Sequence, residues 1–254
     1  IADENGTVDL KIAKPTEGTY LDVDAMGLFW SLERKDEVQD IEQAITDKLA
    51  PHKLTISLHI QNEVEDELEL IRLWKAPNIA REDVRDDGLV GTFFYDDSKE
   101  KKPGVMVLGG SEGGIYEYLA SLLAAHGFNV LALGYFGVED LPKGLHDIPM
   151  EYFKRGINWM KARMEVAEGW LGIHGTSRGA ELALLTGSLF EDIRAVVALN
   201  GFAVPFAGIV PWTDDEFLPP AWTLNGEAIP YLRPENPIEI ALQCKEMWMN
   251  GKGN

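Results

Sequence analysis

From residue 104 onward, short apolar runs alternate with segments of helical spacing, and this alternation constrains the fold more than any other feature of the chain. The runs and segments follow one another in β-α-β-α-β-α-β order. Strands that alternate with helices in this way form a parallel sheet with right-handed crossovers. The expected strands are residues 104–108, 129–136, 170–173 and 195–199, and the expected helices are residues 116–126, 149–166 and 177–190. This part of the chain is therefore predicted to be a doubly wound α/β domain.

Two of these helices carry further predictions. Gly127 follows the first helix and is a suitable C-cap. The second helix has an apolar face, which predicts that this face is buried. Its members are Phe153, Ile157, Met160 and Met164. After residue 201 the pattern fades into a stretch rich in Pro and Trp, and a last helix is expected over residues 237–250.

The chain before about residue 97 reads as all-β with one helical segment. Period-2 alternation is clearest in the last two of four early strand-like segments, and an acidic turn at residues 63–67 predicts that these two pair as a hairpin. The segments are residues 8–12, 27–32, 53–60 and 67–74, a further strand is expected over residues 88–95, and helical spacing covers residues 38–49. This set favours an antiparallel, immunoglobulin-like sandwich.

A polar stretch from Asp96 to Pro103 separates the two patterns. We place the domain boundary there, with a partial β-sandwich in residues 1–97 and a partial α/β domain in residues 98–254. The chain lacks an initiator Met, which indicates that it begins inside a longer protein.

The net charge of -19 argues against binding to nucleic acid or anionic lipid. No apolar run reaches 18 residues, and the first residues do not form a signal peptide, so neither a membrane span nor secretion is expected. The single cysteine, Cys244, fits a reducing compartment and a cytoplasmic location. The sequence predicts no cofactor and no metal site.

The motif Gly175-Thr-Ser-Arg-Gly179 has the form G-x-S-x-G and lies between an expected strand and an expected helix. In that context it predicts a nucleophile elbow, in which Ser177 sits in a strained turn at a helix N-terminus. Glycines are required two residues to either side because side chains there would clash. The alternative is a serine N-cap between two packing glycines.

A glycine-rich loop, Gly109-Gly-Ser-Glu-Gly-Gly114, follows the first strand of the α/β pattern. In α/β-hydrolases one oxyanion donor is the N–H after the nucleophile, here Arg178, and the other comes from such a loop. We therefore predict an oxyanion hole formed by Arg178 with Ser111 or Gly110. A phosphate-binding loop is disfavoured because no Lys-Ser/Thr follows, and a plain glycine-rich turn remains open.

Hydrolase triads on this fold run in the order nucleophile, acid, histidine. All five histidines of this chain precede Ser177: His52, His59, His126, His146 and His174. The sequence also gives no two further strand signals after residue 199 that would carry an acid and a base. We therefore expect the catalytic Asp and His to be missing from this chain, and a serine without a base is a poor nucleophile.

The chain resembles the family of acyl-CoA thioesterases and bile-acid-CoA:amino-acid N-acyltransferases. The motifs that carry the resemblance extend to about residue 201 and occur in a specific joint order. They are Ala2-Asp-Glu-Asn-Gly-Thr-Val-Asp-Leu10, Gly27-Leu-Phe-Trp-Ser31, Val84-Arg-Asp-Asp-Gly-Leu-Val-Gly-Thr-Phe-Phe94, Pro103-Gly-Val-Met-Val-Leu-Gly-Gly-Ser-Glu-Gly-Gly114, Glu117-Tyr-Leu-Ala-Ser-Leu-Leu123, Ala132-Leu-Gly-Tyr-Phe136, Glu139-Asp-Leu-Pro142, Glu151-Tyr-Phe153 and Gly175-Thr-Ser-Arg-Gly-Ala-Glu-Leu182.

The resemblance implies an α/β-hydrolase domain after a β-sandwich, and an acyl-CoA substrate that a serine acyl-enzyme hydrolyses to CoA and free acid. It leaves three alternatives: transfer of the acyl group to an amino acid, a carboxylesterase or dienelactone-hydrolase-like enzyme, and a binding protein with a vestigial site. Tyr135 and Phe136 are expected either to wall the acyl pocket or to belong to the core. Arg178 either contacts a CoA phosphate or faces solvent. Residues 204–222 are a candidate lid.

Overall fold

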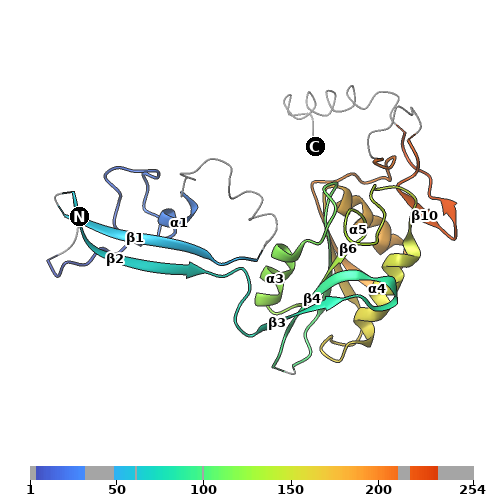
Figure 1. The fold of residues 1–254 in the computed structure, drawn as a ribbon, viewed down its shortest axis with the longest axis horizontal. Coiled ribbons are helices and arrows are strands. Elements are labelled where there is room, and N and C mark those ends of the chain that lie inside the picture. The colour runs from blue at the N-terminus through green and yellow to red at the C-terminus, as the bar shows by residue number, and fades with distance from the viewer. Residues whose placement is uncertain (1–3, 32–48, 61, 99, 211–217, 234–254) are drawn as a thin grey trace. The chain divides into compact units, whose positions relative to one another are not determined.

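The computed structural model describes residues 4–31, 49–60, 62–98, 100–210 and 218–233. The chain forms two compact units, residues 1–48 and residues 49–254. Figure 1 shows the course of the chain and the labels of its elements.

The described part of the first unit, residues 4–31, contains turns and the short helix α1 (Gly27–Trp30). The Asp24 carboxylate accepts hydrogen bonds of 2.7 Å from the Met26 amide and from the Trp30 indole, and these bonds lower the pKa of Asp24. The strand predicted at residues 27–32 is therefore wrong over its described part. The reason is that a side chain which accepts hydrogen bonds from nearby donors stabilises a local turn, which competes with pairing in a sheet.

The strand predicted at residues 8–12 is wrong for the same reason. The Asp9 carbonyl accepts the amides of Ile12 and Ala13 at 3.1 and 2.8 Å, and the Asp9 side chain accepts the amide of Lys11. These bonds close a turn. The helices predicted at residues 38–49 and 237–250 lie outside the described residues, apart from Leu49.

The predicted hairpin is confirmed. Strand β1 (His52–Ile60) pairs antiparallel with β2 (Glu63–Arg72), and Thr55 lies opposite Glu69. The turn comes earlier than predicted, because residues 63–67 already belong to β2. Asn62, just before it, has φ 69°, a left-handed conformation that asparagine tolerates well. The sandwich around this hairpin stays a prediction.

A six-stranded sheet forms the body of the second unit (Figure 1). Its strand order is β3-β4-β6-β5-β8-β9. The four strands β6, β5, β8 and β9 are parallel, which confirms the predicted doubly wound sheet. Its strands are β3 (Ile79–Val84), β4 (Val90–Asp96), β5 (Gly104–Leu108), β6 (Asn129–Gly134), β8 (Leu171–Thr176) and β9 (Ile193–Leu199).

The strand predicted at residues 88–95 exists as β4, but it belongs to this sheet rather than to the β-region. It pairs antiparallel with β6 on one side and with β3, which the sequence pattern did not predict, on the other. The reason is that residues 90–94 are buried on both faces of the strand, as in a central strand of a sheet. The sheet therefore begins before residue 98, where we placed the boundary.

Helices cover both faces of the sheet. On one face Ala120 and Ala124 of α3 (Glu117–Ala125) pack in a cluster with Val107. On the other, α4 (Met150–Ala162) and α5 (Arg178–Leu189) pack in a cluster with Met106 and Leu108. Alternate residues of a strand face opposite sides, so β5 supplies both cores. The three predicted helices are thus confirmed, and Gly127 follows α3 with φ 92°.

Helix α4 is shorter than predicted. Its apolar face buries Phe153, Ile157 and Met160, but Met164 is 83% exposed. The helix ends at Ala162 because Arg163 is extended and turns its guanidinium to the Glu82 carboxylate, at 3.0 and 2.8 Å. A second, three-stranded sheet joins β7 (Ile148–Pro149), β10 (Trp222–Leu224) and β11 (Glu227–Ala228).

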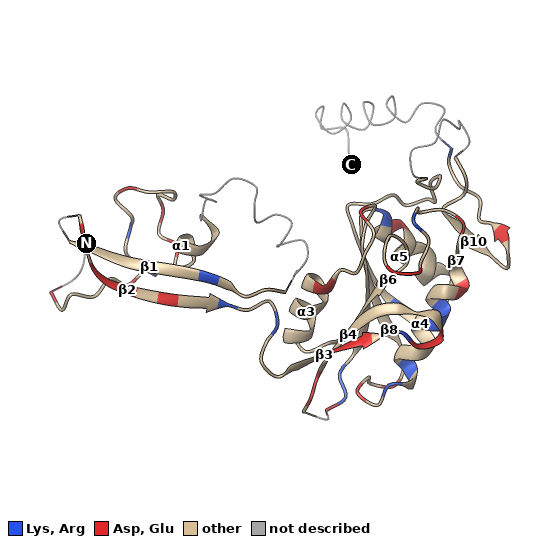
Figure 2. Ribbon diagram, viewed as in Figure 1, with Lys and Arg blue, Asp and Glu red and all other residues tan. Residues whose placement is uncertain are grey.

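The negative charge is unevenly placed. Figure 2 shows acidic residues along β2 and basic residues along α4. Two of these bases, Lys154 and Lys161, pair with Asp192, the former at 2.5 Å. Hydrogen bonds from Lys154 and then Lys161 lower the pKa of Asp192 to about 2.

We expect Asp192→Asn to lower the free energy of unfolding at pH 7 by about 1 kcal/mol, the upper range for partly exposed ion pairs. The pKa of Asp192 is lower in the folded chain than its ordinary value of 3.8, so the pairs stabilise the fold above about pH 4. This stabilisation is lost as the pH falls towards 2. Urea denaturation at several pH values measures the difference, with exposed Asp140→Asn as the control; a difference independent of pH would contradict the prediction.

Candidate active site

Ser177 lies in the sharp turn between β8 and α5. Its φ of 56° and ψ of −119° fall in a region that residues other than glycine rarely adopt. The turn puts the serine at the carboxyl edge of the parallel strands, where ligands bind in open α/β sheets. The strained conformation that the G-x-S-x-G motif predicts is present.

Glycines make this turn sterically feasible. A Cβ at Gly175 would overlap the carbonyl oxygen of Gly179, and a Cβ at Gly179 would overlap that of Gly109. A Cβ at Gly201, which follows β9, would overlap the carbonyl oxygen of Ser177. Three backbone segments therefore meet around Ser177 at distances that exclude any side chain.

The glycine-rich loop brings Gly110 next to Ser177. A Cβ at Gly110 would lie 3.1 Å from the Ser177 Cβ and 3.3 Å from the Thr176 carbonyl oxygen. Gly110 is buried, whereas Ser111 is exposed at the tip of the loop. Arg178 is the first residue of α5, so its N–H has no acceptor within the helix. Of the predicted oxyanion donors, Gly110 and Arg178 thus lie beside Ser177.

Tyr135 and Phe136 hold this loop from behind. The Tyr135 hydroxyl donates to the Gly109 carbonyl at 2.7 Å, and the Phe136 carbonyl accepts the Gly114 amide at 3.1 Å. Both side chains are buried in the core, with 2% and 5% exposure, and burial raises the pKa of Tyr135. Of the two roles we considered for them, core packing is the one that their contacts support.

Arg178 does not face solvent. Its side chain is buried beside that of Glu181, 3.3 Å away, and donates to the Phe206 carbonyl at 3.2 Å. The exposed position that we considered for it is wrong, because the stretch after β9 packs over the start of α5. One sign of this buried position is visible in the sequence, where Glu181 is an acid within the apolar run Ala180-Glu-Leu-Ala-Leu-Leu185.

Glu181 is the centre of a buried polar cluster that sequence reasoning missed. Its carboxylate accepts the Trp222 indole N–H at 2.6 Å and the Phe206 amide at 3.1 Å. Burial raises the pKa of Glu181 and lowers that of Arg178, while each group opposes the shift of the other. The pair thus fixes residues 206 and 222, two parts of the candidate lid, against the helix that carries Ser177.

None of the five histidines, all of which are described, hydrogen bonds to the Ser177 hydroxyl in the described part of the chain. His174 is half-buried on β8, its Nδ1 has no partner there, and desolvation lowers its pKa. His126 bonds the Leu122 carbonyl, and His146 lies 3.1 Å from Asp147. His52 and His59 belong to β1. The site as described places Ser177 at the elbow with Gly110 and the first residue of α5, Arg178, beside it.

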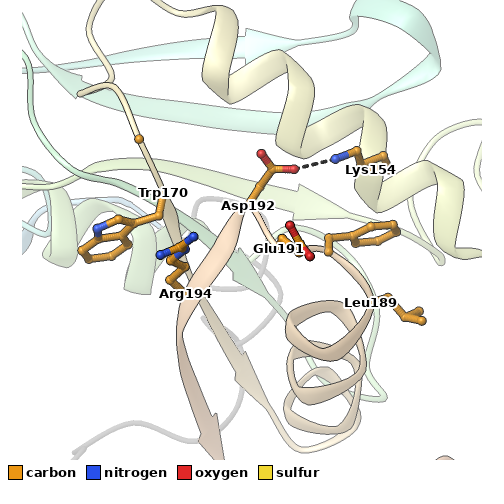
Figure 3. A pocket seen from close by; sticks show the side chains of 8 residues that line it. Lys154, Trp170, Leu189, Glu191, Asp192 and Arg194 are labelled. Carbon is orange, nitrogen blue, oxygen red and sulfur yellow. Dashed lines mark hydrogen bonds and ion pairs between the residues drawn. The ribbon is translucent and has the colours of Figure 1, made fainter.

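A cavity of about 650 Å³ lies at the opposite edge of the sheet (Figure 3). Its lining is Lys154, Gly169, Trp170, Leu189, Phe190, Glu191, Asp192 and Arg194. Lys154 lies on α4 and Arg194 on β9, and the other lining residues precede β8 or β9 or end α5. The full length of β8 therefore lies between the cavity and Ser177. The cavity is therefore not part of the Ser177 site.

Two features are absent from the described residues. These residues contain no helix long and apolar enough to cross a membrane. Within the same ranges, no three His, Cys, Asp or Glu residues gather in a way that could hold a metal ion.

The parallel sheet, its strand order and the elbow at Ser177 define an α/β-hydrolase fold. Residues 1–86 match the family described as "Acyl-CoA thioester hydrolase/BAAT N-terminal region", and residues 148–229 match "BAAT / Acyl-CoA thioester hydrolase C terminal". The chain therefore belongs to the acyl-CoA thioester hydrolase/BAAT family.

Individual relatives agree with this assignment. Acyl-coenzyme A thioesterase 1 of Homo sapiens is 33% identical over 222 residues, which are 86% of this chain and 52% of the relative. Acyl-coenzyme A amino acid N-acyltransferase 2 of Rattus norvegicus is 34% identical over 210 residues, 79% of this chain and 50% of the relative. The chain thus spans about half the length of these curated relatives. Among solved structures, esterase Est22 matches with a TM-score of 0.41 and 20% sequence identity. This match covers 55% of this chain and 48% of the Est22 chain.

We expect Gly175→Ala to destabilise the chain by more than about 2 kcal/mol, because its Cβ would overlap backbone that cannot move aside. Gly172→Ala is the matched control on the same strand: its Cβ would meet the Val105 side chain at 3.4 Å, an ordinary contact. Chemical denaturation of both variants tests this. Equal stabilities would contradict the steric account of the elbow.

Glu181→Leu should lower the free energy of unfolding by about 3–5 kcal/mol, because it leaves the buried Arg178 charge uncompensated. The double variant Arg178→Met/Glu181→Leu should recover part of that loss, since it removes both charges. A double-mutant cycle by urea denaturation measures the coupling. If the double variant were less stable than the single one, the pair would not behave as a coupled unit.

Proposed function

We propose that the full-length protein hydrolyses acyl-CoA thioesters through an acyl-enzyme on Ser177. The observation that carries this proposal is the position of Ser177, strained at the start of α5 with the buried Gly110 beside it, in a chain of the acyl-CoA thioester hydrolase/BAAT family. Names of its relatives include acyl-coenzyme A thioesterase. The substrate would be an acyl-CoA, and no cofactor is required.

In the first step the Ser177 oxygen attacks the thioester carbonyl carbon. The carbonyl oxygen becomes negatively charged and accepts hydrogen bonds from the amides of Arg178 and of the Gly110 loop. The carbon–sulfur bond then breaks, CoA leaves as the thiol with the proton that Ser177 gave up, and an acyl-serine ester remains. Water then attacks this ester and releases the free acid and the serine hydroxyl. Both proton transfers need a general base.

A serine nucleophile favours hydrolysis over transfer to an amino acid. An acyl-cysteine is itself a thioester and stays reactive toward an amine, whereas an acyl-serine is a more stable ester suited to activated water. N-acyltransfer remains the second candidate, because one relative carries the name of such an enzyme. The single cysteine favours a cytoplasmic location, which cell fractionation would test.

The first measurement is the intact mass of the natural gene product, followed by an assay of that protein for CoA release from a series that includes palmitoyl-CoA. Thiol detection reports the CoA. We expect Ser177→Ala to reduce the rate by about 1,000-fold or more, since it removes the nucleophile. Ser188→Ala, an exposed serine on the same helix, is the matched control and should leave the rate unchanged.

Other outcomes would replace the proposal with an alternative. Amide formation in the presence of glycine would favour the acyltransferase. Equal activity on simple esters, without preference for CoA substrates, would favour a carboxylesterase or dienelactone-hydrolase-like enzyme. Failure of a fluorophosphonate to label Ser177, with no CoA release, would favour a binding protein.

A further inference from the structure

An acidic side chain occupies the oxyanion loop. The Gly110 amide, a predicted oxyanion donor, donates instead to the Glu112 carboxylate, at 3.3 Å from Oε1. The other carboxylate oxygen lies 2.7 Å from the position that a Cβ at Gly110 would take, and Ser177 Cβ lies 3.1 Å from the same position. Glu112 and Ser177 are thus both neighbours of Gly110.

A tyrosine supports the carboxylate in this place. The Tyr116 ring packs against the loop, since a Cβ at Gly109 would lie 2.8 Å from its Cδ2. Burial raises the pKa of the Tyr116 hydroxyl, and hydrogen bonding with Glu112 raises it further, so the hydroxyl remains a donor at neutral pH.

The charge of Glu112 is not neutralised nearby. In the described ranges no lysine or arginine forms an ion pair with it. Arg178, the cation closest in sequence to Ser177, is engaged by Glu181 and the Phe206 carbonyl instead. A negative charge therefore stands beside the amide that is expected to stabilise another negative charge, the oxyanion.

We propose that Glu112 is a specificity-determining residue of the oxyanion site, an inference that rests on the proposed function of Ser177. Its carboxylate binds the Gly110 amide in the free protein and must be displaced by the thioester carbonyl. The displaced charge stays close to the reacting carbon, and it disfavours acyl groups that carry a carboxylate near their own carbonyl. The preferred substrates are uncharged acyl chains.

A catalytic role as general base fits the contacts less well. The Glu112 carboxylate bonds to the Gly110 amide, and no hydrogen bond joins it to the Ser177 hydroxyl in the described part of the structure. If Glu112 were a general base, removal of its charge would lower the activity of the enzyme on every substrate. If Glu112 determines selectivity, removal of its charge raises the activity on acidic substrates, which a merely structural role would not produce.

The experiment compares butyryl-CoA with succinyl-CoA, which have four acyl carbons each and differ by one carboxylate. The full-length protein and its Glu112→Gln and Glu112→Ala variants are assayed for CoA release. We expect both variants to raise kcat/KM for succinyl-CoA about tenfold relative to butyryl-CoA, the effect of removing one partly screened like charge. Glu168→Gln, an exposed glutamate paired with Lys101, is the matched control and should leave the ratio unchanged.

Fluorophosphonate labelling of Ser177 in each variant shows whether its site is intact. Labelled variants with an unchanged substrate ratio would overturn the role of Glu112 and leave the proposed function standing. A fall in kcat on both substrates would also overturn it, in favour of a general base. If the unaltered protein neither reacts with the probe nor releases CoA, the proposed function fails, and the inference fails with it.

Discussion

The turn at Ser177 exists because three backbone segments approach one another where glycine stands. Gly175 and Gly179 let the end of β8 fold back against the start of α5, and Gly179 also lets α5 approach the end of β5 at Gly109. Two consequences follow from the same contacts. The serine is held in a conformation that an unconstrained chain would avoid, and the glycine-rich loop is brought beside it. The same backbone contacts therefore determine both the position of the site and the strain in Ser177.

The polar cluster around Glu181 fixes the later part of the chain, as the close contacts at the glycines fix the turn at Ser177. Phe206 lies outside any helix or strand, whereas Trp222 begins the short strand β10. Two hydrogen bonds to one buried carboxylate join these two positions to α5. Such a carboxylate is costly to bury alone, and the Arg178 charge offsets part of that cost.

The sequence predicted the parallel sheet, three helices and the conformation of Ser177, because each depends on local spacing: continuous apolar runs, helical periodicity and glycines at fixed offsets. It failed where a residue's partner is distant. Strand β4 looks like its neighbours in the β-region, and only its pairing with β6 assigns it to the other sheet. The sequence also failed at residues 27–30, where the Asp24 side chain bonds the nearby Met26 amide and Trp30 indole, two local contacts that the spacing of apolar residues does not reveal. Arg178 looked exposed because Phe206, whose carbonyl accepts its hydrogen bond, lies 28 positions away along the chain.

The loop beside Ser177 is fixed at its two ends and exposed at its tip. Tyr135 and Phe136 anchor Gly109 and Gly114 from the core. Ser111 and Glu112 lie between these anchors at exposed positions, and the Glu112 carboxylate turns back to the Gly110 amide. A substitution at Ser111 therefore leaves the anchors and the packing below them undisturbed. In evolutionary terms, the tip is the part of this loop where a substitution disturbs the packing of the core least.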